Sequence, residues 1–129
     1  MKKLFLLLAL TVSINSYSKC YTTYAQTIWD KETNTWKKWV NNFTPFCIDD
    51  DSNDITIYLQ NTVLKFYCYK IEETEKSDMY PFSLVFYCVA EDGNSAIIQL
   101  RQYNINNETG WQLLFYDSDN IIMYAVKMN

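Results

Sequence analysis

The sequence predicts an all-β domain, an antiparallel up-and-down meander of about eight strands. Three observations favour this class. Apolar and polar residues alternate from residue 21 onward, β-branched and aromatic residues fill the alternating runs, and Asp, Asn, Ser and Gly collect between them. No segment of ten or more residues shows the apolar stripe of an amphipathic helix.

The expected strands are separated by short turns, and they cover residues 21–29, 35–43, 54–60, 62–71, 80–91, 95–104, 110–117 and 120–127. The clearest turn is Glu91-Asp92-Gly93-Asn94, because Asp-Gly adopts the positive φ angles of a tight hairpin. Further turns are expected at 60–62 and 117–120, and a longer loop at 30–34. Short connections make neighbouring strands antiparallel, and closure hides the strand edges. We therefore expect a small calycin-like barrel rather than a β-sandwich.

Residues 1–18 are typical of a secretory signal peptide. Lys2 and Lys3 precede an apolar run that is too short to span a bilayer, and small serines follow it. We expect cleavage after Ser18, which leaves one domain at 19–129 in the periplasm or outside the cell. In the alternative, a lipoprotein, Cys20 would carry the lipid, but Lys19 replaces the small residue that this processing prefers.

The charge and the length of the chain argue against nucleic-acid binding and against insertion into a membrane. The chain has 11 basic and 15 acidic residues, and loss of Lys2 and Lys3 leaves nine basic ones and a net charge near -6. An acidic domain of this kind argues against a nucleic-acid partner. No second apolar stretch could cross a membrane as a helix. An outer-membrane barrel is disfavoured by the 111 residues left after removing 18 from 129, and by charges such as Lys65 and Arg101.

Four cysteines remain after cleavage, and an exported chain is expected to oxidise an even set. Facing residues of an antiparallel hairpin have numbers with a constant sum, so a facing pair is centred on its turn. The Cys20–Cys47 pair is centred in the 30–34 loop, and the Cys68–Cys88 pair is centred on residue 78, in another polar segment. We expect these two disulfides among the three connectivities. A redox or zinc site is disfavoured, because the chain lacks a C-x-x-C motif and histidine.

The remaining chemistry argues against an enzyme and against a cofactor. Without histidine there is no Ser-His-Asp arrangement, and two glycines cannot build a phosphate loop. Asp49, Asp51 and Asn53 resemble the start of a calcium loop, but Asp54 and Gln60 replace its glycine and its bidentate glutamate. We expect a polar turn there, and no metal site.

The aromatic residues are the candidate binding groups. Trp29, Trp36 and Trp39 fall in the first hairpin. Tyr67, Tyr69 and Tyr87 lie on the strand faces opposite those of their neighbours Phe66, Cys68 and Cys88. If the Phe face is the core, the tyrosines point outward and form an interaction surface. In the reverse case they line a ligand cavity. Ordinary packing between strands and sheets is the third interpretation.

The sequence resembles uncharacterised small exported proteins of Bacteroidetes type, which look like calycin or lipocalin-like β-barrels. The similarity rests on the Trp-rich first hairpin, the segment from Tyr87 to Gly93 and the closing strand from Ile122 to Val126. It implies export and an all-β fold, and no activity. We expect a non-enzymatic module that binds a protein partner or another copy of itself through an aromatic sheet face. The alternatives are a carrier of a small apolar ligand and an inhibitor of a secreted hydrolase.

Overall fold

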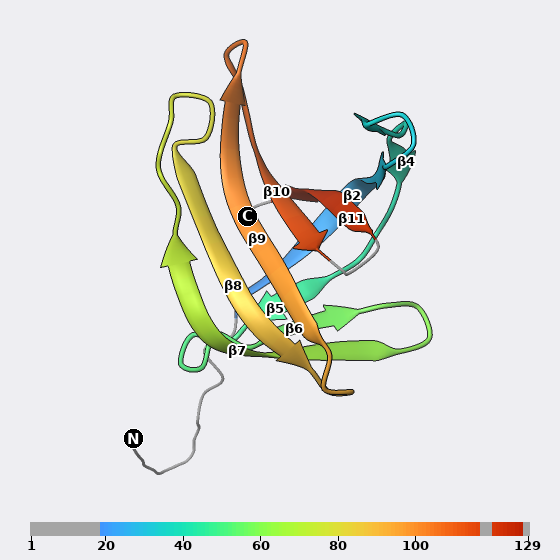
Figure 1. Ribbon diagram of the computed structural model, residues 1–129, viewed down its shortest axis with the longest axis vertical. Helices are drawn as coiled ribbons and strands as arrows, with labels where there is room; N and C mark the ends of the chain where they lie inside the picture. The colour runs from blue at the N-terminus through green and yellow to red at the C-terminus, as the bar shows by residue number, and fades with distance from the viewer. Residues whose placement is uncertain (1–18, 117–119, 128–129) are drawn as a thin grey trace.

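The computed structural model describes residues 19–116 and 120–127, which form an all-β structure (Figure 1). The expected signal peptide and residues 117–119 of the expected last turn lie outside the described residues. Among the residues described, no helix has the length and apolar character of a membrane span.

Ten strands are described, and two of them contain only two residues. They are β2 (Lys19–Asp30), β3 (Thr35–Trp36), β4 (Val40–Asn41), β5 (Phe46–Ile48), β6 (Ile55–Tyr58), β7 (Val63–Glu73), β8 (Phe82–Ala90), β9 (Ser95–Ile105), β10 (Glu108–Tyr116) and β11 (Ile121–Lys127).

Eight of these strands close into an antiparallel barrel. From β5 to β11 each strand pairs with its neighbour in sequence, and β5 pairs with the first residues of β2. The other edge of β2 pairs with β11, so the first and last strands of the meander lie side by side (Figure 1). This closure confirms the expected small barrel and excludes the β-sandwich.

The expected strand at 35–43 is wrong, because that segment is interrupted. β3, β4 and β5 are successive pieces of one segment that runs along β2. The residue numbers of each pair sum to 65 for β3, 66 for β4 and 67 for β5, so the register slips by one residue at each break. Pro45 precedes β5 and has no N–H to donate, which helps to interrupt the ladder there. The three-residue strand β5 was not predicted.

Two buried threonines of β2 supply hydrogen bonds at these breaks. Thr23 donates its hydroxyl proton to Asn42 Oδ1 (2.9 Å), and the same hydroxyl oxygen accepts from the backbone N–H of Thr44 (2.9 Å). At the other break, the Thr27 hydroxyl donates to the backbone carbonyl of Lys37. Both threonines are only 2% exposed. Side chains of β2 thus replace part of the missing backbone ladder.

The turns follow their sequence chemistry. At the predicted tight turn, Ala90 N–H donates to Asn94 O (2.8 Å), and Gly93 adopts a φ of 89°. Another tight turn, which was not predicted, joins β9 to β10 through Asn106 and Asn107, with φ angles of 54° and 66°. Asparagine tolerates this left-handed conformation better than most residues. The strands β9 and β10 therefore extend further than expected.

Side chains fill the inner face of the barrel. Phe66 on β7 contacts Phe115 on β10 with 5.2 Å between ring centroids, and Phe82 on β8 contacts Trp111 on β10 at 5.3 Å. Neither pair joins neighbouring strands, so the rings meet inside the barrel. Phe86 and Cys88 are buried in the same core and Leu84 packs against it, as the predicted alternation along β8 requires.

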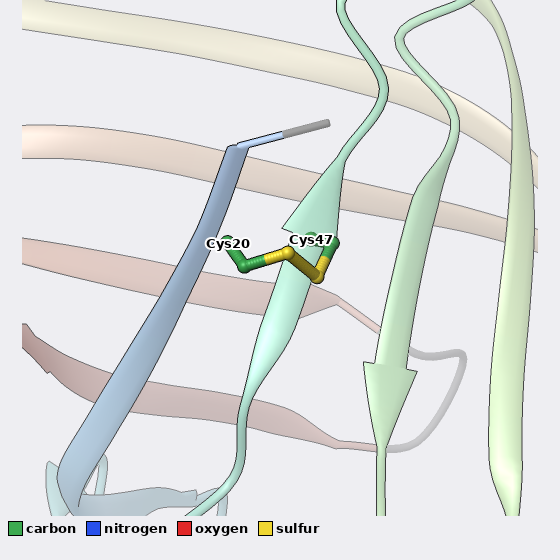
Figure 2. Close-up of a disulfide and its surroundings, with 2 residues drawn as sticks. All are labelled: Cys20 and Cys47. Atoms are coloured by element: carbon green, nitrogen blue, oxygen red, sulfur yellow. A yellow bond between two sulfur atoms is a disulfide. The ribbon is translucent and has the colours of Figure 1, made fainter. Parts of the chain in front are cut away.

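The disulfide between Cys20 and Cys47 joins β2 to β5, as predicted (Figure 2). The two cysteines are direct partners in the register and their Cα atoms are 4.0 Å apart. Because the Cys20 sulfur is used in this bond, it is not free for the lipid thioether of a lipoprotein. The structure therefore disfavours the anchored alternative.

Replacing both Cys20 and Cys47 by serine should lower the free energy of unfolding by about 3.5 kcal/mol, because the bond closes a loop over a separation of 27 residues. Urea unfolding measures this loss. Cys68→Ser, which changes a free thiol, is the matched control and should cost no more than about 1 kcal/mol. Equal stability of the double variant and the unmodified chain would contradict the prediction.

Thr23→Val should destabilise the barrel by about 1–3 kcal/mol, because the buried N–H of Thr44 and the amide oxygen of Asn42 each lose a partner. Thermal or urea unfolding provides the measurement. Thr22→Val, at the adjacent position on the other face of the strand, should change stability by less than about 0.5 kcal/mol. Equal losses at both positions would show that the bridging bonds have no special role.

Candidate functional site

The outer face of β7 and β8 carries the three predicted tyrosines. Tyr67 is 43% exposed and Tyr69 is 65% exposed, while Tyr87 is half-buried. Phe66 and Cys88, their neighbours in sequence, belong to the buried core. The tyrosines therefore lie on the outside of the barrel, as the alternation indicated. We call Tyr67, Tyr69 and Tyr87 the tyrosine face.

A β-bulge at Tyr69 shapes this face. Cys68 pairs with Cys88, but the next pair is Lys70 with Tyr87, which leaves Tyr69 without a partner on β8. The extra residue brings Lys70 beside Tyr87 on the outer side. Bulges of this kind re-aim side chains and bend the strand that carries them. Strict alternation from Phe66 and Cys68 would place Lys70 inside the barrel and Ile71 outside, and the bulge, which was not predicted, reverses this.

Charged side chains of both signs surround the tyrosine face. Lys70 Nζ lies 5.2 Å from the ring centroid of Tyr87, and Lys65 Nζ lies 5.5 Å from that of Tyr67. The Tyr87 hydroxyl donates a 3.0 Å hydrogen bond to Glu72 Oε1, and this bond raises the pKa of Tyr87. Lys70 and Glu72 also approach each other to 4.0 Å. Exposed rings within a charged rim suit contact with another protein.

The three candidate tryptophans lie elsewhere. Trp29 and Trp36 pair across β2 and β3 in an edge-to-face contact with 5.2 Å between centroids, and Trp39 is 42% exposed just before β4. The end of the barrel that carries β4 lies well away from the outer side of β7 and β8 (Figure 1). The structure thus separates the six predicted binding residues into two groups. Trp29 and Trp36 stabilise a hairpin through their mutual contact.

Phe43 forms a second exposed apolar region that was not predicted. It is 74% exposed and lies between two shallow grooves. Pro45, Tyr58 and Leu59 contribute to one groove and Tyr24 contributes to the other. These residues come from β2, β6 and two irregular segments, so no periodic pattern in the sequence marks them as neighbours.

The weak calcium candidate, Asp49, Asp51 and Asn53, forms a turn between β5 and β6. Asp49 Oδ1 accepts hydrogen bonds from the backbone N–H groups of Ser52 (3.0 Å) and Asp51 (2.9 Å), and these bonds lower the pKa of Asp49. Asn53 adopts a φ of 63°. Among the described residues, no group of three or more His, Cys, Asp or Glu side chains is placed to hold a metal ion. The carboxylate at position 49 acts as a turn cap.

A polar network on the outer face of β9 and β10 was also missed. Arg101 Nε donates to Gln112 Oε1 (2.9 Å), and its guanidinium lies 4.1 Å from the ring centroid of Tyr80. The Tyr116 hydroxyl donates to Gln99 Oε1 (2.9 Å), and burial raises the pKa of Tyr116. Because these groups satisfy one another, the network is structural. It holds the segment that precedes β8 against β9.

Cys68 and Cys88 face each other as predicted, but the second expected disulfide is not formed. The Cys68 thiol is half-buried and donates to the backbone carbonyl of Lys70 (3.4 Å), across the bulge at Tyr69. Cys88 is fully buried, and its burial, together with the neighbouring Cys68, raises its pKa to about 12. The Cys88 sulfur therefore remains a protonated thiol at neutral pH, which makes it a poor nucleophile.

Comparison of the chain with protein-family models, curated proteins and solved structures found no match. The resemblance to small exported barrels stays a prediction. The function is therefore inferred from the surfaces described above.

Stability should fall on the alkaline side of neutrality, partly because of Cys88. Burial raises the pKa of Cys88 from its ordinary value of 9.0 to about 12 in the folded chain. The folded state therefore holds this proton more tightly, and the resulting stability is complete below pH 9 and is lost as the pH rises toward 12. Between pH 8 and pH 10, the unmodified chain should lose about 1 kcal/mol more than the Cys88→Ala variant in urea unfolding. Parallel pH profiles would contradict this assignment.

Proposed function

We propose that the protein is an exported, non-enzymatic interaction module that binds a protein partner through the tyrosine face. The observation that carries this proposal is the exposure of Tyr67 and Tyr69 on a barrel strand whose opposite face is packed. Large exposed rings are costly to leave in water and give extensive contact area with little side-chain entropy to lose. The flanking Lys70 and Glu72 add groups that can select a partner by charge.

The packed interior favours this role over that of a small-molecule carrier. A carrier needs an enclosed cavity with room for its ligand. Here the rings of Phe66 and Phe115 meet inside the barrel, and Phe46, Ile55 and Ile98 are completely buried beside them. The aromatic surface that could bind something is therefore on the outside.

Export is part of the proposal. The disulfide between Cys20 and Cys47 is of the kind that persists in oxidising compartments and is rare in the cytosol. The basic and apolar start of the sequence agrees with delivery to such a compartment. Both features support a periplasmic or extracellular site of action.

Site-specific photo-crosslinking tests the proposed face. A photoreactive phenylalanine analogue at position 69 should give one discrete adduct with a protein in the native host. The same analogue at position 79 is the matched control, because Met79 is also exposed (49%) but lies in the loop before β8. The analogue can also be placed at position 87. There, the double variant Tyr67→Ser with Tyr69→Ser should give much less of the adduct than the chain that keeps both tyrosines, while its thermal stability stays the same.

Two outcomes would oppose the proposal. Equal crosslinking from positions 69 and 79 would show that the face has no selectivity. A small molecule that remains bound to the natively purified protein in native mass spectrometry would support the carrier instead.

A further inference from the structure

We propose that a second copy of the chain pairs with the free edge of β7, residues 69–73, in an antiparallel arrangement centred on Ile71. The two barrels would then share one sheet that runs from β8 through β7 into the β7 and β8 of the other copy. This inference rests on the proposed function, because it names a second copy as one partner of the module. The edge shares Tyr69 with the tyrosine face, and Lys70 and Glu72 lie beside both, but Tyr67 and Tyr87 lie outside the edge, so the two can be tested separately.

The edge arises because two neighbouring strands differ in length. β6 contains four residues and pairs with β7 only from Val63 to Phe66, whereas β7 continues to Glu73. Beyond Phe66, the Asp54 carboxylate accepts the backbone N–H of Cys68 (2.9 Å). From Tyr69 to Glu73, no strand among residues 19–116 and 120–127 pairs with that side of β7, and all five residues are exposed. Figure 1 shows the end of β7 along the outer margin of the sheet.

The backbone of Ile71 is directed toward this edge. Thr74 N–H donates to Ser83 O (3.1 Å), so the backbone groups of Thr74 point toward β8. Backbone groups alternate between the two sides along a strand. Those of Lys70 and Glu72 therefore also point toward β8, and those of Ile71 and Glu73 point outward. A second copy related by a two-fold axis at Ile71 could then exchange N–H to O=C hydrogen bonds between the two Ile71 residues.

Charge complementarity selects this register and this partner. In an antiparallel pairing centred on Ile71, Lys70 of each copy lies directly opposite Glu72 of the other, on the outer face. Opposite charges at facing positions stabilise strand pairing, and like charges there oppose it. In a parallel pairing in equal register, Lys70 would face Lys70. Both side chains are more than half exposed, at 59% and 51%, so each can exchange its contacts within the chain for a contact with the second copy.

Apolar contact supports the same axis. Ile71 lies opposite Phe86 on the inner side of the sheet and is still 37% exposed. Two Ile71 side chains would meet across the axis and cover each other. The tyrosine faces of both copies would then lie on the same side of one continuous sheet, which doubles the aromatic surface available to a further partner.

Analytical ultracentrifugation of the purified protein, from 10 µM to 1 mM at low salt, tests the pairing. Because five residues form a short edge, we expect a weak reversible dimer with a dissociation constant of roughly tens to hundreds of micromolar. Lys70→Glu and Glu72→Lys should each weaken it about tenfold, since each converts both facing pairs into like charges. The variant that carries both changes should recover the original affinity to within about threefold.

A mixture of the two single variants gives a more specific test of the same pairing. An equimolar mixture of the Lys70→Glu and Glu72→Lys chains should form a heterodimer, because one copy is then acidic and the other basic at both positions. Lys65→Glu is the matched control, because Lys65 lies on the same face of β7 where β6 already covers the edge, and it should leave dimerisation unchanged. Circular dichroism checks that each variant keeps the barrel.

A monomer at every concentration would overturn the proposal, and so would single reversals that dimerise as well as the unmodified chain. Failure of the double reversal and of the mixture to restore pairing would also overturn it. Discrete crosslinking of another protein from position 69 by a chain that stays monomeric would reject the edge while leaving the proposed tyrosine-face function intact.

Discussion

The pairing of β2 with β11 is the constraint on which the rest of the structure depends. It joins the first and last strands, from Thr22 opposite Lys127 to Ile28 opposite Ile122. Once this ladder is formed, each side chain of the meander points either into the barrel or out of it. Phe66, Phe86 and Cys88 enter one core, and the tyrosines of β7 and β8 remain on the outer surface. The candidate binding surface is thus a consequence of closure.

Much of this arrangement could be predicted from local pattern. β8 alternates regularly, and its predicted faces agree with the burial of Phe86 and Cys88. The Cys20–Cys47 bond was predicted from the constant sum of facing residue numbers, and the two cysteines do face each other, although the sum changes from 65 to 67 between β3 and β5. The missed elements are short or irregular. β5 has three residues after a proline, too few to show alternation, and the turn at Asn106 and Asn107 lacks the glycine that usually marks such turns.

The candidate site was predicted only where the alternation within a single strand shows which side chains point outward. Tyr67 and Tyr87 were found because alternation alone places them opposite core residues. Phe43 and the edge of β7 were missed for a different reason, since both depend on where neighbouring segments stop. A strand was expected at 54–60, but β6 begins at Ile55, which pairs with Phe66, so β7 continues beyond β6 as far as Glu73. Whether Cys68 forms a disulfide depends on the direction in which its thiol points at the bulge. The spacing of the cysteines in the sequence does not encode this direction.

Closure by β11 also makes the residues of this strand indispensable. If a premature stop or a protease removed β11, the ring would open and expose one long ladder on β2 and another on β10. Unpaired ladders of this length recruit further chains. Truncation that reaches β11 would convert a self-contained barrel into a template for aggregation, and it would also remove the buried side chains of residues 123–126.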